Sequence, residues 1–319
     1  MKKVLITGIT GFVGEHLAKH LLAQNTTEII GTYRSDAGLS KFADHKESIT
    51  FEKVDLLNRD QVSQLIAKHK PQQVYHLAGS AATGTSFHSP EQSITNNILS
   101  SLSLLDVLKE QELKETRVMV VSSADIYGLV AEKDLPIDEQ TELRPLNPYA
   151  VSKIAQDYLG LQYHLAYGLD IIRVRPFNHI GPGQNDNFVL PSFAKQIAEI
   201  EKKQKDPILS VGSLDAKRDF TDVRDMVRAY ALLMEKGKTG EVYNIGSGES
   251  YQIKELLDML LALTDQHITI QQDPTKLRPV DVSEFICDAS KFRSLTEWKP
   301  EIPMEKTLQD ILSYWRKRV

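Results

Sequence analysis

Residues 7–22 read TGITGFVGEHLAKHLL and directly follow the apolar run VLI at positions 4–6. Glycine lets the chain turn tightly and lets a phosphate approach bare backbone N–H groups, and the positive end of a following helix attracts that anion. The triplet has GxxGxxG spacing, not the commoner GxGxxG, but it ends a predicted strand and opens a predicted helix. That context favours a dinucleotide-binding turn over a tight turn without a ligand. The cofactor-binding residues expected here are Gly8, Thr10, Gly11, Phe12, Val13 and Gly14.

Short apolar runs alternate with amphipathic segments up to Pro176, which predicts an α/β fold with a doubly wound parallel Rossmann sheet. After Pro176 the rhythm becomes irregular and indicates a smaller C-terminal α/β substrate lobe. We expect residues 1–176 and about 222–246 to form the NAD(P)-binding domain, and residues 177–221 and 247–319 to form the lobe. The predicted strands are 3–7, 28–33, 49–54, 73–78, 117–123 and 170–176, and the predicted helices are 12–24, 58–69, 91–111 and 147–167.

The composition excludes several classes of protein. The net charge is −5 and no basic cluster is present, so we expect no nucleic-acid partner. No window reaches 18 apolar residues, so we expect no membrane span. Cys287 is the only cysteine, which argues against disulfides and fits a reducing cytoplasm. The nine histidines show no metal-binding spacing, so we predict no metal site.

The residue that follows the second strand bears on the choice of dinucleotide. An acidic residue about 20 positions beyond the glycine turn would hold the ribose 2′-hydroxyl of NAD, but this position is Arg34. An arginine suits a 2′-phosphate, so we expect NADP(H) to be preferred. Asp36 leaves NAD(H) possible. The alternative for Arg34 is that it is simply a charged loop residue in solvent, with no cofactor role. Asp55, beside Leu56 after the third strand, either accepts from the adenine amino group or caps a helix.

A tyrosine and a lysine in YAVSK suggest the chemistry. Tyr149 and Lys153 are four residues apart on a predicted helix and therefore share one face. A lysine cation, together with an oxidised nicotinamide, would lower the tyrosine pKa from its usual value near 10, so that the phenol exchanges protons near neutral pH. Ser123, in SSADIYG at a strand end, offers a hydroxyl to a substrate carbonyl. A surface pair and a turn serine are the ordinary alternatives, but with the glycine turn these residues predict a dehydrogenase-type site.

These motifs resemble those of the extended short-chain dehydrogenase/reductases of the nucleotide-sugar branch. The resemblance covers nearly the whole chain and rests on TGITGFVG, VDL, HLAG, NNILSSLSLL, SSADIYG, YAVSK, RPFNHIGPGQ and RDFTDVRD. RPFNHIGPGQ, RDFTDVRDMVRAY and the short chain look most like the GDP-4-keto-6-deoxy-D-mannose reductases. These enzymes reduce the C4 ketone of their substrate to GDP-D-rhamnose with NADPH or NADH.

The resemblance implies a role for each matching residue. Tyr149 would be the proton donor, Lys153 its electrostatic partner and a ribose ligand, and Ser123 the hydrogen-bond donor to the carbonyl. The GDP-sugar would be held by Asn178 and, near its diphosphate, by Arg218 and Arg278, since arginine forks suit phosphate; surface ion pairs are the alternative. Further cofactor-binding residues expected are Leu56, Leu77, Ala78, Gly79 and Asn97, and further residues expected to contact the substrate are Asp125, Val189 and Lys195.

Three alternatives stay open at this point. Related dehydratases place a glutamate two residues after the catalytic Thr or Ser, and here that position holds the shorter Asp125, preceded by Ala124. A 4-epimerase would need a sugar that can rotate in the pocket, and a non-catalytic redox-sensing or scaffold protein would usually have lost the tyrosine or lysine. The resemblance also implies a homodimer, paired through the helices at 91–111 and 147–168.

Overall fold

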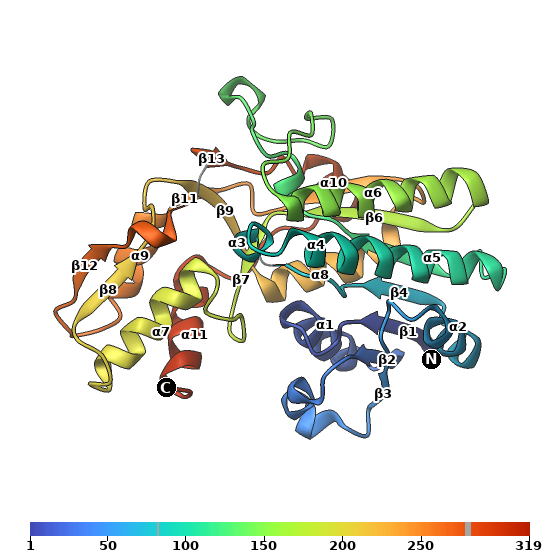
Figure 1. The fold of residues 1–319 in the computed structure, drawn as a ribbon, viewed down its shortest axis with the longest axis horizontal. Coiled ribbons are helices and arrows are strands. Elements are labelled where there is room, and N and C mark those ends of the chain that lie inside the picture. Colours follow the sequence, from blue (N-terminus) through green and yellow to red (C-terminus); the bar gives the residue numbers. More distant parts are fainter. Residues whose placement is uncertain (82, 278–281) are drawn as a thin grey trace.

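The fold is that of a computed structural model, which describes residues 1–81, 83–277 and 282–319. Its main sheet has seven parallel strands in the order β10-β6-β5-β4-β1-β2-β3 (Figure 1). This is the strand order of a doubly wound sheet, and the predicted α/β Rossmann class is confirmed. The strands are β1 Lys2–Thr7, β2 Thr27–Tyr33, β3 Ile49–Lys53, β4 Gln73–His76, β5 Arg117–Val121, β6 Ile171–Pro176 and β10 Val242–Ile245.

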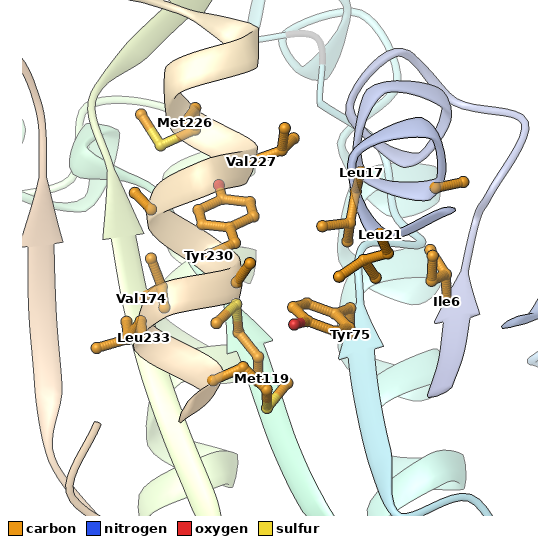
Figure 2. Packing of buried hydrophobic residues seen from close by; sticks show 14 of the residues in the cluster. Ile6, Leu17, Leu21, Tyr75, Met119, Val174, Met226, Val227, Tyr230 and Leu233 are labelled. Carbon is orange, nitrogen blue, oxygen red and sulfur yellow. The ribbon is translucent and has the colours of Figure 1, made fainter. Parts of the chain in front are cut away.

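Helices cover both faces of this sheet, because its strands are apolar on both sides. On one face, Leu17 and Leu21 of α1 and Tyr230 of α8 pack toward Tyr75 and Met119 of the sheet (Figure 2). On the other face, α2, α5 and α6 bury a second cluster. The bounds are α1 Phe12–Ala23, α2 Arg59–His69, α5 Ser100–Glu110, α6 Pro148–Tyr167, α8 Val223–Lys236 and, beside α8, α10 Ser290–Thr296.

The segment predicted as one helix over 91–111 consists of three parts. Helix α4, Pro90–Ile94, continues through a π-helical turn, Thr95–Leu99, into α5. A π turn inserts an extra residue into the helix and shifts the face that the preceding residues present. This turn carries Asn97, whose side chain is fully buried.

Much of the chain after Pro176 forms a second body (Figure 1). This body has its own hydrophobic core. Helices α7 Val189–Glu201, α9 Ile253–Leu261 and α11 Met304–Arg316 pack around it. In the sequence, β10 lies between the two predicted lobe segments. It returns to the main sheet, where it pairs in parallel with β6. The exact division into a cofactor domain and a substrate lobe stays a prediction. Small strands accompany these helices: β7 Asn178–Ile180, β9 Lys217–Asp222, β11 Ser250–Gln252 and β13 Glu284–Phe285 in one sheet, and β8 Ile208–Val211 and β12 Thr269–Gln272 in another.

Two parallel strands end earlier than predicted, and this shapes the site. β4 ends at His76 and β5 at Val121, so the residues that follow each strand lie in loops at the carboxyl edge of the sheet. Ligands bind at this edge in doubly wound folds. Within the described ranges, no helix is both long and apolar enough to cross a bilayer.

Candidate active site

The glycine turn brings backbone close to backbone at the start of α1. Gly8 has a φ of +70°, and a Cβ there would lie 3.0 Å from the Cα of Ala78. A Cβ on Gly14 would lie 2.5 Å from the carbonyl oxygen of Gly8. Gly11 is the N-cap of α1 and supplies no side-chain cap, so the first-turn amides keep their capacity to bind an anion. The turn has the geometry that a dinucleotide diphosphate needs.

Arg34 and Asp36 follow β2 beside this turn, and the structure separates their roles. Asp36 pairs with Lys53 through a 2.9 Å contact between its carboxylate and the ammonium. Ser35 uses its hydroxyl to accept from the amide of Ala37 and so caps the 3₁₀ segment Asp36–His45. Arg34 is exposed at the strand end. Arg34, which suits a 2′-phosphate, is thus exposed to solvent, whereas Asp36 already pairs with the Lys53 ammonium.

The helix-cap interpretation of Asp55 is wrong, because Asn58 caps α2 by accepting from the amide of Gln61. Asp55 is exposed, and its carboxylate accepts a local bond from the amide of Leu57 at 3.1 Å. Its neighbour Leu56 is buried in the sheet core. The adenine interpretation of Asp55 stays a prediction.

The loop after β4 is fixed by Asn97. Its side-chain oxygen accepts from the Ser80 amide at 2.7 Å, and its amide donates to the Ser152 hydroxyl at 2.8 Å. A Cβ on Gly79 would lie 2.6 Å from that same oxygen, so glycine allows the close approach. Asn97 therefore ties the predicted cofactor loop, Leu77 to Gly79, to helix α6.

Ser123, Tyr149 and Lys153 come together, as the sequence predicts, where β5 ends and α6 begins. The Tyr149 hydroxyl hydrogen-bonds to the Ser123 hydroxyl. The Lys153 ammonium lies 5.9 Å from the centre of the Tyr149 ring and donates to the carbonyl oxygen of Val121 at 2.6 Å. Asn147 starts α6 as its N-cap, accepting from the amide of Ala150. The constellation is thus fixed by the cap of one helix and the end of one strand.

The expected lowering of the Tyr149 pKa is not what the protein's own residues produce. Burial raises the pKa of Tyr149 above its usual value, the Asp125 carboxylate raises it further, and the hydrogen bond with Ser123 opposes both. Burial also lowers the pKa of Lys153 to about 7, against a smaller opposing effect of Asp157. The reason is desolvation: both side chains are only 7% exposed, which disfavours their charged forms.

A hollow lies beside these residues, and three of the predicted substrate residues line it: Asp125, Asn178 and Arg218. The Asp125 carboxylate accepts from the Thr83 hydroxyl at 2.8 Å. The Arg218 guanidinium donates to the carbonyl oxygens of Lys217 and Val282, both at 2.7 Å. The other lining residues are Thr83, Phe87, Gly128, Leu146, Asn147, Val282 and Phe285.

Other predicted substrate residues lie outside this lining. Val189 begins α7. Lys195, further along α7, pairs with Asp186 at 2.7 Å and lies over the Trp315 ring at 5.6 Å. Arg278 falls outside the described residues. Substrate roles for these three residues stay predictions.

The sequence analysis missed Thr83, Phe87 and Gln156. Thr83 and Phe87 precede the helix at 90–94 in a stretch without a recognisable motif, and only the fold brings them to the hollow. Gln156 lies three residues after Lys153, so helical spacing could have indicated it. No group of three or more acidic, histidine or cysteine side chains in the described parts of the chain is arranged to hold a metal ion.

Comparison with known proteins places the chain in a family. A model of the family described as GDP-mannose 4,6 dehydratase matches residues 5–311. The chain belongs to the GDP-mannose 4,6-dehydratase family. Within this family of extended short-chain dehydrogenase/reductases, GDP-6-deoxy-D-mannose reductase of Pseudomonas aeruginosa is 37% identical over 318 residues, covering 100% of this chain and 98% of the relative.

Other relatives carry out related reactions. A dTDP-glucose 4,6-dehydratase of Haemophilus influenzae is 27% identical, over 99% of this chain and 98% of the relative. The solved structure of RMD from Pseudomonas aeruginosa complexed with NADPH is 35% identical, with a TM-score of 0.86 and 100% of both chains covered. A UDP-glucuronic acid 4-epimerase from Bacillus cereus, in complex with UDP-glucuronic acid and NAD, is 26% identical, with a TM-score of 0.88 and 99% of both chains covered. The chain is accordingly an NAD(P)-dependent enzyme of the oxidoreductase type.

Proposed function

We propose that this protein reduces the C4 ketone of GDP-4-keto-6-deoxy-D-mannose to the alcohol of GDP-D-rhamnose, using NADPH or NADH. The observation that carries the proposal is the joining of Ser123, Tyr149 and Lys153 beside a hollow lined by Asn178 and Arg218. The full-length similarity to a GDP-6-deoxy-D-mannose reductase supports the choice of sugar and of reaction direction.

The protein's own residues perform the acid chemistry. A bound NAD(P)H supplies the hydride. The Tyr149 hydroxyl donates its proton to the oxygen that forms at C4, and the Ser123 hydroxyl donates a hydrogen bond that stabilises the charge on that oxygen. The Lys153 ammonium lies over the Tyr149 ring and favours the phenolate left after the proton transfer.

The pKa of Tyr149 fits the protonation state from which a reduction starts. A reductase starts with a protonated tyrosine, and burial together with Asp125 raises the pKa of Tyr149 and keeps the phenol protonated at neutral pH. A dehydratase or 4-epimerase starts by oxidising a C4 hydroxyl, for which Tyr149 must first accept a proton. The protein's own residues thus hold Tyr149 in the protonated form from which a reduction starts, and the positive charge of Lys153 favours the later loss of that proton.

The preferred cofactor is NADPH. Arg34 is exposed where the adenosine ribose binds in this fold, and a guanidinium suits a 2′-phosphate. Asp36, the carboxylate that would favour NAD, is paired with Lys53. NADH remains a weaker second donor in this proposal.

A GDP-mannose 4,6-dehydratase is the second candidate, favoured by the Asp125 carboxylate in the hollow. That reaction needs an acid–base group to remove the C5 proton and help expel the C6 hydroxyl. Asp125 is held by Thr83 at 2.8 Å, and the preceding residue, Ala124, is buried and has no acidic group. The site therefore offers fewer acid–base groups than favour the dehydratase reaction.

A paired assay separates the two functions. One reaction contains GDP-4-keto-6-deoxymannose and NADPH, and the loss of nicotinamide absorbance is followed. The other contains GDP-mannose and catalytic NADP, and a 4-keto product is sought. Stoichiometric NADPH loss in the first reaction alone supports the reductase, whereas keto product in the second reaction establishes the dehydratase and overturns our proposal.

The protein also has a surface suited to self-association. Large apolar side chains of the π turn, α5 and α6 are exposed, and α6 presents an apolar hollow. We propose that two copies pair here as a homodimer, since exposed apolar patches of this kind commonly mark an interface. A cytoplasmic location likewise stays a prediction. The exposed apolar residues are Leu99, Leu102, Val151, Tyr158 and Leu165.

A further inference from the structure

A fully buried glutamine lies directly against the catalytic lysine. The side-chain oxygen of Gln156 accepts from the Lys153 ammonium at 2.6 Å. Its amide nitrogen donates to the Ser101 hydroxyl on α5, also at 2.6 Å. Gln156 and Ser101 are both 0% exposed. A buried amide with both ends hydrogen-bonded has a single orientation, because reversing it would place a donor against the ammonium.

The hydrogen bonds beyond Ser101 fix that orientation. The Ser101 hydroxyl donates to the carbonyl oxygen of Asn97 at 2.9 Å, so its lone pairs accept from Gln156 and from His76. Complete burial lowers the pKa of His76 to about 3, so the ring is neutral and carries one proton. That proton lies on Nε2, facing Ser101 at 2.9 Å, and Nδ1 accepts from the Thr7 hydroxyl at 2.9 Å. With this assignment, each of these hydrogen bonds joins a donor to an acceptor.

The chain of bonds ends at the cofactor loops. The Thr7 hydroxyl, at the end of β1, accepts from the amide of Ala78 at 3.1 Å. Thr7 immediately precedes the glycine turn, and Ala78 lies in the loop after β4. The buried side chains therefore connect the predicted cofactor-binding loops to Lys153 through α5 and α6.

We infer that Gln156 is a positioning residue, which aims the Lys153 ammonium at Tyr149 and the nicotinamide ribose. This inference rests on the proposed function. An ammonium has three N–H groups, and in the described residues two of them go to Val121 and Gln156. These two bonds leave the third N–H for the reacting groups. A hydrogen bond from an amide carbonyl also favours the charged form of the lysine.

The charged and titratable groups around Lys153 are Asp157, His76 and Tyr149. Asp157 raises the pKa of Lys153, and the charge of Lys153 helps to keep His76 neutral. Tyr149 faces Lys153 from the preceding turn of α6. The Asp157 carboxylate is shared with Arg173 at 2.6 Å and Arg175 at 2.8 Å. The Asp157 carboxylate already pairs with two guanidiniums. The neutral Gln156 is therefore the side chain that accepts from Lys153.

Two substitutions test the role of Gln156. Gln156→Met keeps the length and removes the acceptor, whereas Gln156→Glu keeps an acceptor and adds a negative charge. For Gln156→Met we expect kcat with NADPH to fall on the order of ten- to a hundred-fold, with KM for the sugar almost unchanged, because misaimed catalytic groups cost rate. In Gln156→Met, the decline of activity at high pH should begin at lower pH than in wild type, because loss of the acceptor disfavours the lysine cation. In Gln156→Glu it should begin at higher pH, because a carboxylate favours that cation.

The control is Gln196→Met. Gln196 is also buried, and its side-chain oxygen also accepts from a lysine, Lys205 at 2.7 Å, but on α7. This variant should lose stability without a change in the pH profile. Unchanged kcat and an unchanged pH profile in folded Gln156→Met would overturn the inference, as would equal pH profiles for the two Gln156 variants.

NADPH affinity, followed by fluorescence titration across pH, is a readout that needs no sugar. Weaker NADPH binding by Gln156→Met than by wild type, with a pH dependence that Gln156→Glu moves in the opposite direction, supports the inference. Identical titrations overturn it. If wild type binds NADPH but turns over no GDP-4-keto-6-deoxymannose, the proposed function fails, and the titrations still decide the role of Gln156.

Discussion

The Lys153 ammonium lies 5.9 Å from the centre of the Tyr149 ring, one turn further along α6, and also donates to the backbone oxygen of Val121. Val121 ends β5, and Ser123, two residues on, hydrogen-bonds to Tyr149. A side chain of the helix therefore binds the strand, and a side chain after the strand binds the helix. This reciprocal contact holds the three proposed catalytic groups in register without a flexible connection.

Ser123→Ala should reduce kcat on the order of 10²- to 10³-fold, because it removes one hydrogen-bond donor from the oxygen that becomes charged. The measurement is steady-state NADPH oxidation with the keto sugar. Ser103→Ala is a matched control, since the buried Ser103 hydroxyl has no hydrogen-bond partner among the described residues. A Ser123→Ala enzyme as fast as the control would remove Ser123 from the mechanism.

Lys153 should make stability depend on pH. Its pKa is about 7 in the folded protein and near 10.5 in the unfolded chain, so between these values the unfolded chain holds a proton that the folded protein has lost. The free energy of unfolding of wild type, relative to Lys153→Met, should therefore rise with pH from 7 to 10, by at most about 1.4 kcal/mol per pH unit.

Urea denaturation at pH 7 and pH 9.5 measures this difference. Lys254→Met, which removes an exposed lysine that pairs with Asp258, should show no comparable rise. If the difference in free energy of unfolding between wild type and Lys153→Met stays constant with pH, Lys153 keeps an ordinary pKa in the folded protein.

Arg34→Ala should raise KM for NADPH roughly ten- to a hundred-fold and leave KM for NADH nearly unchanged, because hydrogen bonds to a charged group contribute about 1.5–3 kcal/mol. Initial rates with both cofactors test this. Arg59→Ala provides the control, since Arg59 is paired with Asp106 and Glu110. An equal rise in KM for both cofactors would show that Arg34 does not bind the 2′-phosphate.

Leu165 should contribute to the proposed dimer, because it is 72% exposed on α6. At micromolar concentration, light scattering should give twice the 36.0 kDa chain mass for wild type and the single-chain mass for Leu165→Glu. Leu263→Glu, at an exposed leucine outside these helices, should stay dimeric. A monomeric wild type would exclude this interface.

Local patterns in the sequence were sufficient to predict the main sheet and the three residues that meet in the candidate site. Strand periodicity, the glycine triplet and the YxxxK spacing all act over a few residues, and the structure brings Ser123, Tyr149 and Lys153 together as expected. The cap of α2 could not be settled this way, because both Asp55 and Asn58 are good caps, and only the backbone geometry selects Asn58.

Long-range contacts set the features that the sequence did not reveal. The sign of the Tyr149 pKa shift depends on burial, which no short motif encodes. Thr83 reaches Asp125 across 42 residues, and Gln156 meets Ser101 across 55. The π turn at Thr95–Leu99 interrupts a helix whose leucine pattern looks continuous. In each case, packing between distant elements determines the outcome.

The most direct test of the account is to follow the hydride itself. The enzyme is incubated with GDP-4-keto-6-deoxymannose and NADPH that carries deuterium at the transferable position, and the sugar product is analysed by NMR and mass spectrometry. We predict one deuterium, bonded to C4, in the wild-type product, and a rate at least about 10²-fold lower for Tyr149→Phe, which lacks the proton donor. Product without deuterium at C4, or a Tyr149→Phe variant with the wild-type rate, would contradict the proposed reduction.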